Sequence, residues 1–188
     1  MESSLQSTAP APVSDVAVPW GREQELVYRR YILWFVYACM IYSIIGFSWG
    51  AIMGGVPGIR HFVDQRLHGD LIVRAHTHIN LLGWVEMAIF AGVYYIIPRL
   101  VKSTIYSLKL VKVHFWTHNV GLLGMVIMFS AAGVIGGRAS ETLPPVQVEQ
   151  HVSQMLAFVG LFGSLVLLAN IIWAYNIFRT CAGWVKNQ

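Results

Sequence analysis

Four long stretches of mostly apolar residues alternate with short polar segments along the chain. They cover residues 31–53, 74–97, 113–135 and 151–175. Each stretch is long enough for an α-helix that crosses a bilayer, which needs about 20 residues. The segments between them are richer in charged residues, glycine and proline. The pattern predicts an all-α integral membrane protein, in which the four helices form a bundle.

The two ends of the chain differ from this pattern. Residues 1–29 begin with a Ser-, Ala- and Pro-rich segment that lacks the basic start and apolar centre of a signal peptide. We expect a flexible cytoplasmic N-terminal tail there, one membrane domain over residues 30–178, and a cytoplasmic C-terminal tail over residues 179–188. The polar segment 54–73 is predicted to be a loop.

Composition supports the membrane assignment. Of the 188 residues, 56% are hydrophobic and only 12% are charged, more apolar surface than a soluble domain of this size can bury. The isoelectric point near 9.2 would suit a nucleic-acid-binding protein. In a membrane protein, however, it reports Lys and Arg in cytoplasmic loops. We therefore expect the protein to lie in the lipid bilayer and to bind no nucleic acid.

The basic residues also predict the orientation of the helices. Cytoplasmic loops of membrane proteins carry an excess of Lys and Arg. Nine of the 13 basic residues lie before the first helix, between the second and third, or after the fourth. Both termini are therefore expected in the cytoplasm, with the protein a multi-pass component of the inner (cytoplasmic) membrane. His76, His78 and His151 then lie near the outer side.

The second apolar stretch carries the candidate chemistry, because it opens with His76 and His78. Ionisable groups inside a membrane helix are costly and usually functional. Residues two apart in an α-helix differ by about 200° in direction. The two imidazoles therefore cannot ligate one small ion. They bind two different centres on opposite sides of the helix, or one is a ligand and the other an orienting or solvated group.

A buried heme fits this geometry, since its iron takes an imidazole nitrogen on each face. The heme iron is thus the metal that we expect at His76 and His78. Gly83 would leave room for the macrocycle, and Arg74 and Arg138 would pair with the propionates. His151 is the candidate for the second axial ligand.

Three further polar residues lie in the predicted helices. His114 and His118 are four residues apart and share one helix face. They suit a metal or a quinone headgroup, although packing at the inner membrane surface is the interpretation we favour. Glu86 lies eight residues after His78, about 80° further round the helix. It is a candidate proton or polar relay, or accepts a hydrogen bond from a neighbour such as Asn170.

The motif around the paired histidines makes the interpretation more specific. His-Thr-His-x-x-x-Leu-Gly-Trp (residues 76–84), followed by Tyr-Tyr-x-x-Pro-Arg (residues 94–99), resembles subunit I of the heme-copper oxidase and nitric oxide reductase superfamily. It is similar to two helices of that subunit. The second-helix match implies that His76 is the low-spin heme ligand. The tenth-helix match, which we follow, implies His78 and gives His76 to a high-spin heme.

The resemblance also has a limit. The family subunit has about twelve helices in three arcs, whereas this chain offers four, similar to one arc of a C-type oxidase. No copper-binding histidine pattern accompanies them. The resemblance therefore implies a subunit that holds one or two b-type hemes and transfers electrons in a respiratory complex, with cytochrome c or quinone as redox partner.

Two other functions stay open at this point. In an oligomer or beside a partner chain, the same helices would form a heme enzyme that reduces nitric oxide or oxygen. Alternatively, the chain is a structural subunit without cofactor, or a membrane protein that handles heme or copper.

Overall fold

The computed structural model describes residues 21–186, and every regular element in that range is helical. Residues 1–20 of the tail predicted for residues 1–29, and the last two residues of the chain, lie outside it. The elements are α1 (Arg22–Gly55), α2 (Pro57–Gln65), α3 (Asp70–His78), the π-helix η1 (Ile79–Val85), α4 (Glu86–Leu100), α5 (Leu108–Ala139) and α6 (Pro145–Lys186).

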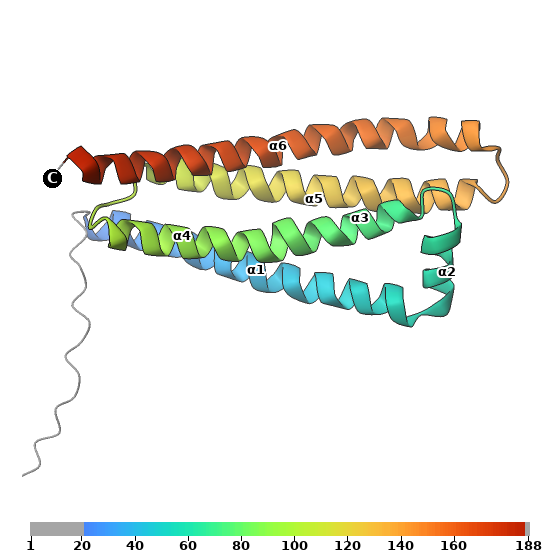
Figure 1. Ribbon diagram of the computed structural model, residues 1–188, viewed down its shortest axis with the longest axis horizontal. Helices are drawn as coiled ribbons and strands as arrows, with labels where there is room; N and C mark the ends of the chain where they lie inside the picture. Colours follow the sequence, from blue (N-terminus) through green and yellow to red (C-terminus); the bar gives the residue numbers. More distant parts are fainter. Residues whose placement is uncertain (1–20, 187–188) are drawn as a thin grey trace, which may run out of the picture.

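Four helical rods run antiparallel in an up-down-up-down arrangement (Figure 1). The second rod is composite, because α3, η1 and α4 follow one another without a break. The start of α1 and the end of α6 lie at the same end of the bundle, together with the α4–α5 connection. The short helix α2 lies across the opposite end.

The helices extend further into polar sequence than predicted. Residues 22–29, expected in the tail, are the first turns of α1, and residues 179–186 are the last turns of α6. In α1, the helical ion pair Arg29–Glu25 (2.6 Å) stabilises these turns before the apolar stretch. Part of the predicted loop 54–73 is also helical, since Pro57 begins α2 at a position where proline favours helix.

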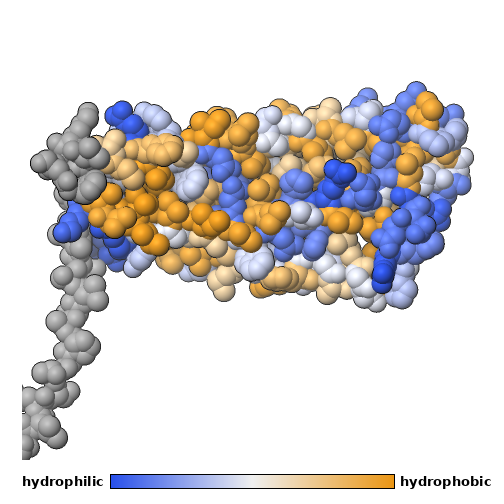
Figure 2. Space-filling view, in the orientation of Figure 1, coloured by the Kyte–Doolittle hydropathy of each residue, from blue (hydrophilic) through white to orange (hydrophobic). Residues whose placement is uncertain are grey.

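The surface of the rods is that of a multi-pass membrane protein. All four are long and apolar enough to cross a bilayer. Large apolar side chains such as Leu167 and Phe178 are 62% and 72% exposed. Proteins that fold in water rarely expose apolar surface on this scale. Figure 2 shows the same distribution, with apolar residues over much of the middle of the bundle and polar residues concentrated toward the end that carries α2.

Glycines let the helices approach closely. A Cβ atom on Gly121 of α5 would lie 2.9 Å from the Phe162 carbonyl oxygen of α6, so only glycine fits at this contact. On α1, a Cβ on Gly50 would lie 2.8 Å from His76 Nε2, and Gly46 makes room for Asn80. Small residues at such positions drive helix association in lipid.

We predict that Gly121→Ala destabilises the bundle, whereas Gly160→Ala does not. The new methyl group on α5 meets backbone of α6 and costs about 1–3 kcal/mol in overpacking. Gly160 has open space around it, so alanine there gains about 0.5–1 kcal/mol from helix propensity. Thermal unfolding in detergent, followed by circular dichroism, compares the two. Equal midpoints would contradict close packing of α5 on α6.

Candidate functional site

His76 and His78 face opposite neighbours, as the helix geometry predicts. The His76 ring lies on the α1 side, 6.4 Å from the Trp49 ring centroid and against Gly50. The His78 ring lies on the α5 side, 5.2 Å from Phe129. The two imidazoles therefore do not share a centre.

The two imidazoles differ in how they are held. His78 Nδ1 donates a hydrogen bond to the Arg74 carbonyl oxygen at 2.7 Å. A bond of this kind fixes the tautomer of a ligand histidine and leaves Nε2 for a metal. His76 is packed with its Nε2 toward Gly50 of α1. His78 is thus the better oriented for an iron, and its donor chemistry and half-buried position fit a heme axial ligand.

The structure places the other predicted heme contacts less favourably. The space at Gly83 is filled by Tyr42 of α1, whose Cγ would lie 2.8 Å from a Cβ there. No macrocycle enters at that point without displacing the tyrosine. Arg74 is paired with Asp70 at 3.1 Å, and Arg138 is exposed at the end of α5.

His151 is separated from the paired histidines. It is exposed near the start of α6, and its Nδ1 donates to the Gln147 carbonyl oxygen at 2.7 Å. Its helix packs chiefly on α5. No group of three or more His, Cys, Asp or Glu side chains gathers into a metal site within residues 21–186. The helix of His151 therefore packs on α5 rather than on α3, which carries His78.

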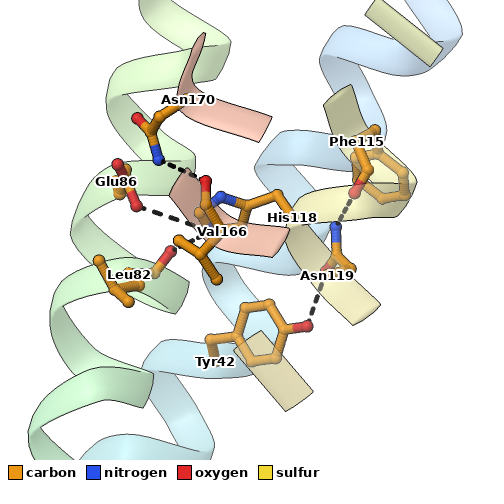
Figure 3. A network of polar contacts seen from close by, with 8 residues as sticks. All are labelled: Tyr42, Leu82, Glu86, Phe115, His118, Asn119, Val166 and Asn170. Atoms are coloured by element: carbon orange, nitrogen blue, oxygen red, sulfur yellow. Dashed lines mark hydrogen bonds and ion pairs between the residues drawn. The ribbon is translucent and has the colours of Figure 1, made fainter. Parts of the chain in front are cut away.

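A second group of polar side chains lies in the interior, where α4, α5 and α6 meet (Figure 3). His118 of α5 is fully buried, and its Nε2 donates to the Leu82 carbonyl oxygen at 3.1 Å. The same nitrogen lies 3.6 Å from Glu86 Oε2. Asn170 of α6 lies beside that carboxyl group. Glu86 thus faces α5 and α6 rather than His78.

One helical turn away, His114 is also fully buried, and its Nδ1 shares a hydrogen bond of 3.0 Å with the Tyr94 hydroxyl of α4. The Phe90 ring packs on both histidines, with centroid distances of 4.4 and 5.2 Å. The favoured interpretation of His114 and His118 as packing residues is confirmed, and both imidazoles pack in the core of the bundle rather than on its surface.

The sequence held a signal for this interior group. His114 and His118 have the spacing of one helix face, and Glu86 is a carboxyl group within an apolar helix. The direction of Glu86 was not predictable by counting about 100° per residue. The π-helix η1 precedes it, and its i→i+5 hydrogen bonds change the turn per residue.

Comparison with known proteins places the chain in a family. Residues 26–166 match the model for "Cytochrome C and Quinol oxidase polypeptide I". The chain is 30% identical over 136 residues to cytochrome c oxidase subunit 1 of Rhodobacter capsulatus, covering 68% of this chain and 24% of the relative. It is 34% identical over 137 residues to cytochrome c oxidase polypeptide 1 of Halobacterium salinarum, covering 71% and 22%.

A third relative, a cytochrome c oxidase subunit 1 homolog of Agrobacterium tumefaciens, is 26% identical over 164 residues, which are 81% of this chain and 29% of the relative. The chain thus spans about a quarter of the length of the curated relatives that it matches. The family match covers most of the four-helix bundle, including both groups of histidines. The chain belongs to the cytochrome c and quinol oxidase polypeptide I family.

Proposed function

We propose that this chain is a membrane subunit that binds b-type heme through His78 and transfers electrons within a respiratory complex. The observation that carries the proposal is the imidazole of His78. Its Nδ1 is bonded to a backbone carbonyl, and its Nε2 is left for a metal. The membership of the oxidase family supports the same cofactor. A heme bound there supplies reversible one-electron transfer.

The remaining residues around His78 have supporting roles in this proposal. Arg74, one turn before His78, pairs with a propionate after exchanging its exposed partner Asp70. Arg138 is exposed on the neighbouring helix and serves the second propionate. Gly83 is left out of the heme contacts, because Tyr42 fills the space beside it.

The proposal includes an assembly larger than one chain. His78 is half-buried at the bundle surface, so part of a heme bound to it would lie outside this bundle. We propose that further chains, copies of this one or different subunits, cover the heme. His151 becomes the second axial ligand only where a neighbouring chain brings its α6 against α3. We propose cytochrome c or quinone as the redox partner. We also propose that the subunit lies in the inner membrane with both termini in the cytoplasm.

We predict that His78→Ala removes the low-spin b-type signal from the reduced-minus-oxidised spectrum of the purified protein, because the axial nitrogen is lost. The matched control is His61→Ala on α2, an exposed histidine at the same end of the bundle. The control should keep the wild-type heme content. A low-spin spectrum that survives in His78→Ala at equal expression would exclude His78 as the ligand.

The assembly is tested by native mass spectrometry of the protein in mild detergent. We expect heme to accompany an oligomer or a complex with another subunit. A strictly monomeric, partner-free chain that retains low-spin heme would contradict the assembly and leave the heme assignment standing.

One observation favours a second function. His76 points away from His78 toward α1, so a second, high-spin heme that displaces Gly50 of α1 from His76 Nε2 would form a heme enzyme that reduces nitric oxide or oxygen. An open iron position binds carbon monoxide. We predict carbon monoxide binding by the reduced complex that His76→Ala abolishes. No binding in the wild type would restrict the function to electron transfer.

A further inference from the structure

Four buried polar atoms in the core have no hydrogen-bond partner among the described residues, although the core around them is apolar. They are His114 Nε2, His118 Nδ1, Glu86 Oε2 and Trp173 Nε1. Most buried polar groups in proteins are paired, and the exceptions call for an explanation. One such atom would be a local defect. Four of them, contributed by three helices, indicate a polar ligand.

The side chains that carry these atoms are neighbours. The rings of His114 and His118 have centroids 6.1 Å apart. Phe90 packs against both, and against Trp173 of α6 at 5.0 Å. One water with two hydrogen bonds of about 2.9 Å would be long enough to join ring nitrogens on imidazoles at this separation.

The hydrogen-bonding roles of the two histidines complement each other. A backbone carbonyl only accepts, so His118 carries its proton on Nε2, which faces Leu82 O. Its unpartnered Nδ1 is therefore an acceptor. On His114, Nδ1 shares its bond with the Tyr94 hydroxyl. When that hydroxyl donates, the unpartnered Nε2 of His114 is a donor.

We propose that ordered water binds between His114 and His118 and completes a proton-transfer line from Tyr94 to Glu86. The water accepts from His114 Nε2–H and from Trp173 Nε1–H and donates to His118 Nδ1. That gives it the three bonds typical of buried water. None of these residues contacts the proposed heme ligand His78, so the inference is independent of the heme.

Each step of the line exchanges one bond to hydrogen for another. The Tyr94 hydroxyl gives its proton to His114 Nδ1 while His114 Nε2 gives one to the water. The water gives a proton to His118 Nδ1, and His118 Nε2 releases one to the Glu86 carboxylate, 3.6 Å away. One proton leaves Tyr94, which becomes a tyrosinate, and one arrives at the Glu86 carboxylate, which becomes neutral, with no oxidation or reduction.

The line also has a direction in the bundle. Tyr94 lies beside Asn176 of α6, whose amide binds the backbone of Ser107 at both its N–H and its C=O, each at 3.0 Å. Ser107 caps α5 at the end of the bundle that carries the α4–α5 connection. Glu86, at the other end of the line, lies near the middle of the second rod. The line thus starts at a tyrosine that Asn176 ties to that end of the bundle and stops at a carboxyl group near the middle of the second rod.

The test uses the full chain with ¹⁵N-labelled histidine, in lipid bilayers, by solid-state NMR. We expect cross-peaks between water protons and the rings of His114 and His118. Their N–H protons should exchange with D₂O at least about tenfold faster than the backbone amide of Leu122, a fully buried residue of the same helix. Tyr94→Phe should slow the exchange at His114 about tenfold, whereas Tyr95→Phe, at an exposed neighbouring position, should leave it unchanged.

A second variant keeps the test decisive if Tyr94→Phe does not fold. Glu86→Gln preserves the shape of the side chain and removes the proton acceptor. It should retain the water cross-peaks and slow the exchange at His118. Absence of water contacts at both rings in the wild type would overturn the proposal. The proposal would also be overturned if the ring N–H protons of both histidines exchanged as slowly as the backbone amide of Leu122. Equal exchange rates at His118 in the wild type and in Glu86→Gln would overturn it as well.

Discussion

Hydrogen bonds from buried side chains of α5 determine how this bundle is assembled. In lipid, apolar side chains gain little by facing another helix, so packing and polar contacts decide which faces meet. His118 bonds the Leu82 carbonyl of η1, and Asn119 accepts from the Tyr42 hydroxyl of α1 at 2.7 Å. Adjacent residues of one helix thus hold two different rods, and α5 becomes the centre of the bundle.

Glycine complements these bonds on the remaining contacts. Gly121 brings the backbone of α6 against α5, and Gly50 of α1 admits the imidazole of His76. Each of these helix–helix contacts depends on a hydrogen bond or on a glycine that allows close packing, and apolar side chains alone would not specify it. These contacts determine which helix faces meet in the interior of the bundle, although large apolar side chains cover its outer surface.

The sequence predicted the architecture because that part depends on long, regular patterns. Four apolar stretches gave four spanning helices, and the angle between helix positions correctly set His76 and His78 on opposite faces. The first turns of α1 were missed, since the helix starts in polar residues where the ion pair Arg29–Glu25 stabilises it. The burial of His114 was missed because it depends on a tertiary partner, Tyr94.

The structure separates two kinds of chemistry. His78 is half-buried and oriented by a backbone bond, as suits a ligand for a cofactor shared with other chains. Glu86 and His118 lie in the interior, as suits groups that act on protons rather than on a large cofactor. The family match spans both, but the chain supplies only about a quarter of the length of its relatives.

The measurement that tests the account most directly is the heme content and spin state of the complex isolated from its native membrane. Heme extraction and electron paramagnetic resonance on the same sample provide both. The account predicts b-type heme in an amount stoichiometric with this chain and a low-spin signal with two imidazole ligands. An intact complex that contains the full-length chain and no heme would contradict it.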